Sequence, residues 1–231
     1  MKYKHLFFDL DHTLWDFERN SSESLEEIFH KFSLNHLGLV SSEPFIRTFQ
    51  KINTALWDSF DRGLIHHTYI RENRFQMVFH DLGIECPAHH IEIGECYLQS
   101  LPTKNHLLAG AMELLQYVSA RGYFIHIITN GFNDIQEKKI ASSGITHFFE
   151  HVVTFEVAKA KKPDRKIFEY ALQVTGANIK ESIMIGDNWT ADILGAKKAG
   201  LDTIYYNPAG LQFDESPTYE VTRLEEMKQI F

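Results

Sequence analysis

The sequence predicts an α/β protein: a doubly wound, Rossmann-like core with a mostly parallel sheet, interrupted after its first strand by an inserted helical domain. Three observations lead to this prediction. A short apolar run ends in a carboxylate at residues 5–9, helical periods without convincing strands fill residues 17–101, and strands alternate with helices after residue 102. Such alternation implies right-handed crossovers, which lay parallel strands side by side with helices on both faces.

The first strand and the insertion come in that order along the chain. Residues 5–9 are apolar until Asp9, which is typical of a buried strand whose carboxyl end opens onto a site. Four amphipathic helices follow, and their apolar positions recur at helical spacing, as in the series that includes Phe45, Phe49 and Leu56. Four successive helices can bury their apolar faces against one another, so we expect the insertion to be a compact module.

The remainder of the chain alternates between the two element types. The expected helices span residues 107–120, 135–143, 166–174 and 191–199, and the expected strands span residues 123–129, 151–154, 182–185 and 203–206. Glycines follow two of these helices, at Gly122 and Gly200, where a glycine commonly ends a helix. The predicted domains are therefore an α/β core of residues 1–15 and 102–231 and a helical domain of residues 16–101.

The composition is that of a globular protein. Of 231 residues, 44% are hydrophobic and 23% are charged, which argues against disorder and against a fibrous repeat. The formal net charge is -8, with 31 acidic against 23 basic residues and no long basic run, so a nucleic acid polymer is not an expected partner. No apolar stretch approaches the roughly 20 residues that span a bilayer, and the amino terminus lacks a signal-peptide core. We therefore expect a cytoplasmic protein without a membrane partner.

Candidate functional residues lie where predicted strands end, at Asp9, Thr129 and Asp187. The carboxyl ends of parallel strands meet at one edge of a sheet, so residues far apart in sequence are expected to converge there. At the first strand end, Asp9 and Asp11 can supply a nucleophile and a proton donor to a leaving oxygen. An Asp-x-Asp pattern by itself is also common in solvated turns.

The second candidate site is Thr129-Asn130-Gly131. Thr129 offers a hydroxyl, Asn130 an amide and Gly131 an unhindered backbone N–H, and these groups bind phosphate oxygens. Taken alone, the same three residues are equally compatible with a structural turn.

Two further sites carry charge. Lys162, held in front of a proline, can neutralise a transferring phosphoryl group, and Lys159 and Lys161 are alternatives for that role. Asp187 follows a predicted strand and Asp192 comes shortly after it. Paired carboxylates of this kind suit a hard cation such as Mg²⁺, although a turn followed by a helix cap would also account for Asp192.

These four motifs, in this order, resemble those of the haloacid dehalogenase superfamily of phosphohydrolases. The resemblance covers the whole chain once the helical insertion is counted as the family's type 1 cap, which closes over the site and contacts the substrate. It implies a magnesium-dependent hydrolase that dephosphorylates a small phosphorylated metabolite through an aspartyl-phosphate intermediate. Asp9 is then the nucleophile and a magnesium ligand. Asp11 is the general acid and later the base, and its backbone carbonyl is a further magnesium ligand.

The resemblance also implies roles for the other motifs. Thr129, with help from Asn130, would hold the phosphoryl oxygens, and Lys162 would stabilise charge on the nucleophile and on the phosphoryl group. Asp187 would bind magnesium directly. Asp192 would support the metal through water or from outside the set of direct ligands.

A narrower resemblance concerns the substrate. The segments FFDLDHTLWDF, from Phe7 to Phe17, and KPDRKIFEYAL, from Lys162 to Leu172, are similar to a bacterial branch that includes pyrimidine 5′-nucleotidases. His12 departs from the superfamily pattern, which often has glycine there. A nucleoside 5′-monophosphate phosphatase is therefore the expected activity, acting as a monomer or a homodimer.

Other activities stay open. Cap residues choose the substrate, so hydrolysis of phosphoglycolate or a sugar phosphate is the main alternative. A phosphomutase would keep the same four motifs. A 2-haloacid dehalogenase needs neither magnesium nor an acid at Asp11, so the presence of Asp11 and Asp187 argues against it. The complete motif set also argues against a non-catalytic binding protein.

Overall fold

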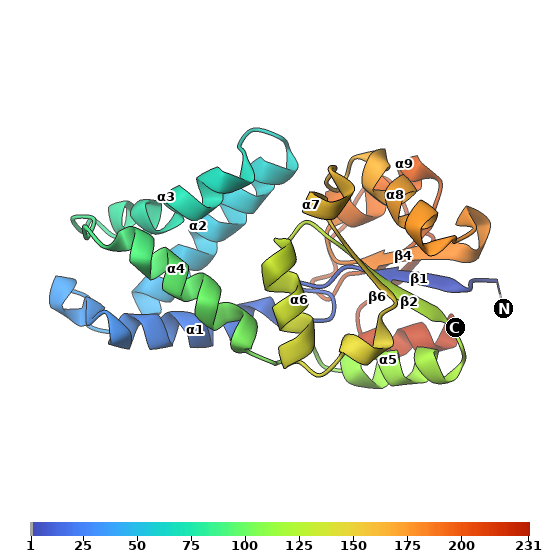
Figure 1. The fold of residues 1–231 in the computed structure, drawn as a ribbon, viewed down its shortest axis with the longest axis horizontal. Coiled ribbons are helices and arrows are strands. Elements are labelled where there is room, and N and C mark those ends of the chain that lie inside the picture. The colour runs from blue at the N-terminus through green and yellow to red at the C-terminus, as the bar shows by residue number, and fades with distance from the viewer. Residues whose placement is uncertain (1) are drawn as a thin grey trace. The chain divides into compact units, whose positions relative to one another are not determined.

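The computed structural model describes residues 2–231 and divides the chain into two compact units (Figure 1). The α/β unit consists of the chain up to Phe17 together with Asn105–Phe231, and the helical unit is Glu18–Lys104. Each unit has its own buried core.

A six-stranded sheet forms the centre of the α/β unit, and every pair of neighbouring strands in it is parallel. Its order is β3-β2-β1-β4-β5-β6. The strands are β1 (His5–Phe8), β2 (Phe124–Thr129), β3 (His151–Thr154), β4 (Ser182–Gly186), β5 (Asp202–Tyr206) and β6 (Tyr219–Val221). The first strand of the chain is therefore central, and the predicted doubly wound α/β fold is confirmed.

Register at the middle of the sheet decides which residues meet. Phe8 of β1 pairs with Ile127 of β2 on one side and with Ile185 of β4 on the other. The next one or two residues of these three strands, Asp9, Thr129 and Asp187, therefore leave the sheet at the same edge.

Helices cover both faces of this sheet, with α8 and α9 on one face and α5 on the other (Figure 1). The helices of the unit are α5 (Ala111–Ala120), α6 (Asn133–Ser142), α7 (Phe155–Ala158), α8 (Arg165–Thr175) and α9 (Gly195–Ala199). Phe7, Ile128 and Met184 extend from the three central strands into one buried cluster, where they pack with Phe168 and Ala196. Continuous apolar strands of this kind are typical of a sheet that is buried on both faces.

Helix α5 begins four residues later than the sequence pattern predicts. Leu107 instead forms an antiparallel bridge with Trp15, and the N–H of Leu108 donates to the carbonyl of Leu14 at 2.9 Å. Gly110 then turns the chain with a φ of 84°, a conformation that favours glycine. These tertiary backbone contacts compete with a helix over residues 107–110, and local periodicity does not reveal them.

Two elements near the carboxyl end were not predicted. Strand β6 is only three residues long, and a 3-10 helix covers Leu224–Gln229. Both are too short to show a hydrophobic period. The predicted helix at residues 191–199 is divided into a π-helical segment, Trp189–Leu194, and α9.

The helical unit contains four main helices: α1 (Phe17–Lys31), α2 (Glu43–Asp61), α3 (His67–Asp81) and α4 (His90–Ser100). Its core is rich in aromatic rings, and Phe49 lies 5.4 Å from Phe75 and 4.8 Å from Tyr97 between ring centroids. No strand occurs among the described residues of this unit. The apolar faces predicted from helical spacing therefore pack against one another.

Candidate active site

Asp9 directly follows β1 and is 7% exposed. Its backbone N–H donates to the carbonyl of Ile185 at 2.8 Å, which continues the hydrogen-bond ladder between β1 and β4. Burial raises the pKa of the Asp9 carboxyl to about 7, although the neighbouring Lys162 opposes the rise. Burial therefore disfavours the charged form of Asp9, and Lys162 beside it favours that form.

Lys162 is 2% exposed and uses all three of its ammonium N–H groups. Its Nζ donates to Asp9 Oδ1 and to Asp192 Oδ1, both at 2.6 Å, and to the carbonyl of Ile128 at 2.9 Å. Burial lowers the pKa of Lys162, but the two carboxylates outweigh it and raise the pKa above its ordinary value. The ammonium therefore stays charged beside Asp9. Lys159, one of the two alternatives for this role, is exposed.

Asp192 is fully buried behind the edge of the sheet. Its Oδ2 accepts from the N–H of Asn188 at 3.0 Å. A side chain at Gly186 would place its Cβ 2.2 Å from this same oxygen, so the close approach of Asp192 requires glycine there. Asn188 also caps the following helical segment by accepting from the N–H groups of Thr190 and Ala191.

Three carboxylates form one cluster, in which Asp9, Asp187 and Asp192 bring oxygens within 4.8 Å of one another. Burial raises the pKa of Asp187 and that of Asp192 to about 6. When all three are ionised, three negative charges against the one ammonium of Lys162 leave a net charge of -2. A set of oxygen ligands with this charge fits a hard divalent cation such as Mg²⁺.

Thr13 joins the first and fourth motifs, although the sequence assigned it no role. It is fully buried, and its hydroxyl donates to Asp187 Oδ1 at 3.0 Å while accepting from the Asp187 N–H at 3.1 Å. The same oxygen lies 3.4 Å from Asp9 Oδ2. Thr13 therefore fixes the orientation of Asp187 relative to Asp9.

Thr129 ends β2 with its hydroxyl oxygen already accepting two hydrogen bonds. The N–H of Gly131 donates to it at 3.0 Å and Gln136 Nε2 donates at 2.7 Å. A hydroxyl has two acceptor positions and one hydrogen, so the remaining hydrogen is the group that Thr129 can offer to a phosphoryl oxygen. A Cβ at Gly131 would lie 2.3 Å from Gln136 Nε2, which explains the need for glycine at that position.

Asn130 forms a reciprocal pair with the backbone of Lys162. Its Nδ2 donates to the Lys162 carbonyl at 2.9 Å, and its Oδ1 accepts from the Lys162 N–H at 2.8 Å. The pair ties the loop after β2 to the loop that carries the lysine. The contacts of Asn130 and Gly131 with a substrate stay predictions.

Asp11 makes its side-chain contacts with α6 instead of with the three-carboxylate cluster. Lys139 Nζ donates to Asp11 Oδ1 at 2.7 Å and to Asp11 Oδ2 at 2.9 Å. Gln136 Nε2 donates to Asp11 Oδ2, also at 2.9 Å. The side chain of Asp11 is 25% exposed, so it keeps an open side.

Gln136 and Lys139 were not predicted as site residues. Both are buried on α6, where they share the inward face of the helix with Ile135 and Ile140. Polar residues at three-residue spacing on an otherwise apolar helix face, immediately after Thr129-Asn130-Gly131, are the sequence signal that would have indicated them.

The chain is similar to known proteins over most of its length. Residues 3–200 match the family model of the haloacid dehalogenase-like hydrolases. The chain belongs to this family. It is 33% identical to the pyrimidine 5′-nucleotidase PynA of Streptococcus pneumoniae over 98% of this chain and 94% of that protein. It is 31% identical to the pyrimidine 5′-nucleotidase YjjG of Escherichia coli over 100% of this chain and 98% of that protein.

A solved relative has the same fold. The structure of the HAD-hydrolase YfnB from Bacillus subtilis, bound to magnesium, superposes with a TM-score of 0.88 and 28% identity over 100% of this chain and 99% of that chain. Together these relatives make the present protein a phosphatase of the haloacid dehalogenase-like family, that is, a phosphoric monoester hydrolase.

One departure from the family pattern has a structural explanation. His12 adopts a φ of 64°, in the left-handed region of backbone conformation. This region favours glycine, the residue that many haloacid dehalogenase-like proteins have there. His12 is exposed, and its N–H donates to the carbonyl of Trp15 at 3.0 Å, so the turn keeps its shape without glycine.

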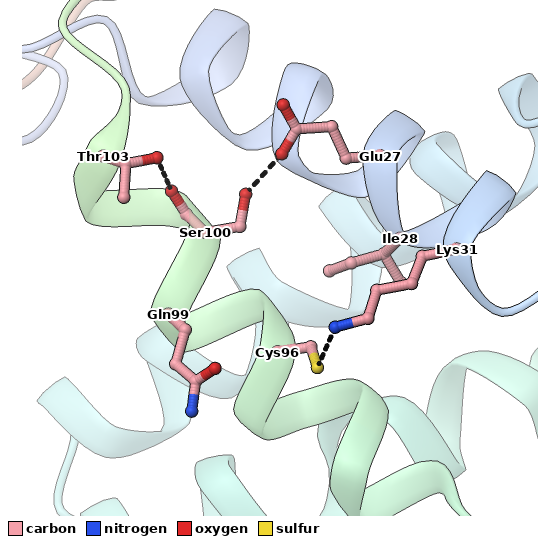
Figure 2. A pocket seen from close by; sticks show the side chains of 7 residues that line it. All are labelled: Glu27, Ile28, Lys31, Cys96, Gln99, Ser100 and Thr103. Atoms are coloured by element: carbon pink, nitrogen blue, oxygen red, sulfur yellow. Dashed lines mark hydrogen bonds between the residues drawn. The ribbon is translucent and has the colours of Figure 1, made fainter.

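The helical unit has a surface hollow of about 320 Å³. Figure 2 shows the side chains that line it. It is lined by residues of α1 and α4 and by Thr103, which follows α4. Lys31 Nζ donates to Cys96 Sγ at 3.1 Å, and Ser100 Oγ donates to Glu27 Oε2 at 2.7 Å. None of its lining residues belongs to the four motifs.

Across residues 2–231, no helix combines the length and the apolarity needed to cross a membrane.

Proposed function

We propose that this phosphatase is a magnesium-dependent nucleoside 5′-monophosphate phosphatase that prefers pyrimidine nucleotides and acts through an aspartyl-phosphate on Asp9. The mechanism is supported by one observation above all. Asp9 Oδ1 is held at 2.6 Å by Lys162, within a cluster that also contains Asp187 and Asp192. The substrate class is supported by the similarity to two pyrimidine 5′-nucleotidases over almost the whole chain.

In the transfer step, a carboxylate oxygen of Asp9 forms a bond to phosphorus while the bond from phosphorus to the ester oxygen breaks. Asp11 gives its proton to that departing oxygen, so a neutral nucleoside leaves. Lys162 stays beside Asp9 and offsets negative charge on the phosphoryl group. The free hydrogen of the Thr129 hydroxyl donates to a phosphoryl oxygen.

In the hydrolysis step, water attacks the phosphorus of the aspartyl-phosphate. Asp11, now a carboxylate, takes a proton from the water, and the bond between phosphorus and the Asp9 oxygen breaks. The products are inorganic phosphate and the original Asp9 carboxylate. Fixed positions matter in both steps, because phosphoryl transfer depends mainly on alignment and charge neutralisation.

Asp9 and Asp187 would hold the magnesium ion together with the backbone carbonyl of Asp11. Asp192 would support these ligands without binding the ion directly. When bound, the cation supplies charge neutralisation between the phosphate and the carboxylates. The helical unit, residues 18–104, is proposed as the cap that contacts the rest of the substrate.

The test is phosphate release from a panel of nucleoside monophosphates, sugar phosphates and phosphoglycolate, with magnesium and with chelator, for wild type and for Asp9→Asn. We expect pyrimidine monophosphates to be hydrolysed fastest, and Asp9→Asn to lower turnover by at least about a thousandfold because the amide is not a nucleophile. Retained turnover in Asp9→Asn would overturn the mechanism. Preference for phosphoglycolate or a sugar phosphate would overturn the substrate class alone.

A second variant tests Asp11. Asp11→Asn should slow both formation and breakdown of the phosphoenzyme with an alkyl ester such as a nucleotide, because one carboxyl group serves both steps. Rapid acid quench of labelled enzyme measures the two rates separately. Wild-type rates for both steps would remove Asp11 from this role.

A further inference from the structure

Helix α6 presents a buried cation to Asp11. Lys139 is 3% exposed, and its Nζ contacts both carboxylate oxygens of Asp11, at 2.7 and 2.9 Å. The ammonium also lies 4.4 Å from the ring centre of Trp15 and 5.4 Å from that of Phe17. A contact with both oxygens restrains rotation of the carboxylate, which a contact with a single oxygen does not.

Gln136 adds a second restraint from the same helix. The two N–H groups of its amide are directed to Asp11 Oδ2 at 2.9 Å and to Thr129 Oγ1 at 2.7 Å. The opposite orientation of the amide would set its oxygen against the Asp11 carboxylate, so the observed assignment is the favourable one. Gln136 thereby links the acid-base carboxylate to the residue expected to hold the phosphoryl group.

The aromatic residues around Lys139 are themselves held. Trp15 is fully buried, and its Nε1 donates to Ser143 Oγ at 3.1 Å. Lys139 therefore lies between a fixed ring and Asp11. Because an unpaired buried charge is costly, the Asp11 carboxylate stabilises the buried ammonium. Asp9 has its own cation in Lys162, so the two carboxylates of the first motif are paired separately.

We propose that Lys139 and Gln136 are positioning residues that hold the Asp11 carboxylate as the base for the hydrolysis of the phosphoenzyme. The inference rests on the proposed function and deepens it. The hydrogen bonds from α6 leave one side of the Asp11 carboxyl group open, where an attacking water can reach it. Because alignment of the base governs this step, loss of the restraints slows breakdown of the phosphoenzyme more than its formation.

The test compares Lys139→Met with wild type by rapid acid quench, using labelled p-nitrophenyl phosphate. Its phenolate leaves without needing a proton, so formation of the phosphoenzyme does not depend on Asp11 as a proton donor. In Lys139→Met we expect breakdown to slow on the order of 10- to 100-fold while formation stays within about twofold. The steady-state fraction of enzyme held as phosphoenzyme should rise accordingly.

Matched variants make the result specific. Lys138→Met changes an exposed lysine on the same helix and should behave as wild type. Lys139→Arg keeps a cation and should recover part of the breakdown rate, and Gln136→Leu should also slow breakdown. Gln136→Leu keeps the proposal testable if Lys139→Met does not fold.

Two outcomes would overturn the proposal. If formation and breakdown of the phosphoenzyme slow equally in Lys139→Met, the role of α6 is merely structural. If the rate of breakdown is unchanged, Lys139 has no role in positioning Asp11. Failure of the proposed function gives a different result, because wild type would then form no phosphoenzyme and Asp9→Asn would retain turnover.

Discussion

The two units of this phosphatase each bury a cationic side chain, and they compensate its charge in different ways. In the α/β unit, Lys162 lies 2.6 Å from a carboxylate oxygen of Asp9 and from one of Asp192. In the helical unit, Arg74 is 4% exposed and donates from Nη1 to Asn53 Oδ1 at 2.9 Å. No carboxylate within residues 2–231 forms an ion pair with Arg74.

Aromatic rings surround Arg74 instead. Its guanidinium carbon lies 5.0 Å from the ring centre of Phe49 and 4.7 Å from that of Tyr97. Burial lowers the pKa of Arg74, whereas the carboxylates raise the pKa of Lys162. A buried cationic side chain can therefore have either of two roles. Lys162 pairs with two carboxylates at the proposed active site, whereas Arg74 fills a core in which no carboxylate of the described chain pairs with it.

Removing the charge of Lys162 should have the largest effect. In Lys162→Met, Asp9 and Asp192 lose their buried partner, so the free energy of unfolding at pH 8 should fall by about 3–5 kcal/mol. Urea denaturation of wild type and variant measures this difference, and phosphate release should be lost as well. A variant as stable as wild type would show that the carboxylates do not depend on the ammonium.

Magnesium removal should have the next largest effect, on the α/β unit. Magnesium at about 100 times its Kd should raise the unfolding free energy by about 2.7 kcal/mol and Tm by roughly 5–10 °C. The pKa values of about 7 for Asp9 and about 6 for Asp187 and Asp192 lie above the ordinary 3.8, so the folded chain binds extra protons between pH 4 and 7. Without metal, these groups therefore lower stability as pH rises through that window.

The gain in Tm from magnesium should consequently increase from pH 5 to pH 8, because protons and the cation compete for the same oxygens. Thermal melts with magnesium and with chelator at both pH values measure it. Asp187→Asn should reduce the gain. If magnesium raises Tm equally at pH 5 and pH 8, the cation binds to residues other than these three carboxylates.

Replacing one glycine in each unit with alanine tests how tightly the two units are packed. Gly186→Ala would force a Cβ to within 2.2 Å of Asp192, so we expect a loss of about 1–3 kcal/mol and lower turnover. Gly94, inside α4, has Phe75 Cδ2 at 3.4 Å from such a Cβ, an ordinary contact. Gly94→Ala should therefore stabilise the helical unit by about 0.5–1 kcal/mol. Equal effects in chemical denaturation would contradict the difference.

Arg74→Met should have the smallest effect. No ion pair is broken, and the cost of burying the guanidinium disappears, so the unfolding free energy should change by less than about 1 kcal/mol. Denaturation beside Lys162→Met provides the direct comparison. A loss as large as that of Lys162→Met would show that the aromatic rings compensate the charge of Arg74 as effectively as carboxylates do.

The sequence by itself determined the fold class and the strand ends at which polar residues gather. Apolar runs that end at Asp9, Thr129 and Asp187 indicate buried parallel strands, and the geometry of parallel sheets then requires these ends to share an edge. The family was also predictable, because its motifs are short, local and ordered along the chain. These features depend on neighbouring residues and on general rules of chain topology.

Only the tertiary structure decided how the side chains pair. It joined Lys162 to Asp9 across 153 positions of the chain and Lys139 to Asp11 across 128. It also placed Thr13 between two motifs. Pairings of this kind depend on the register of strands and the rotation of helices about their axes, which no local pattern records. A buried polar side chain is therefore recognisable in the sequence as an exception, but its partner is known only once the chain has folded.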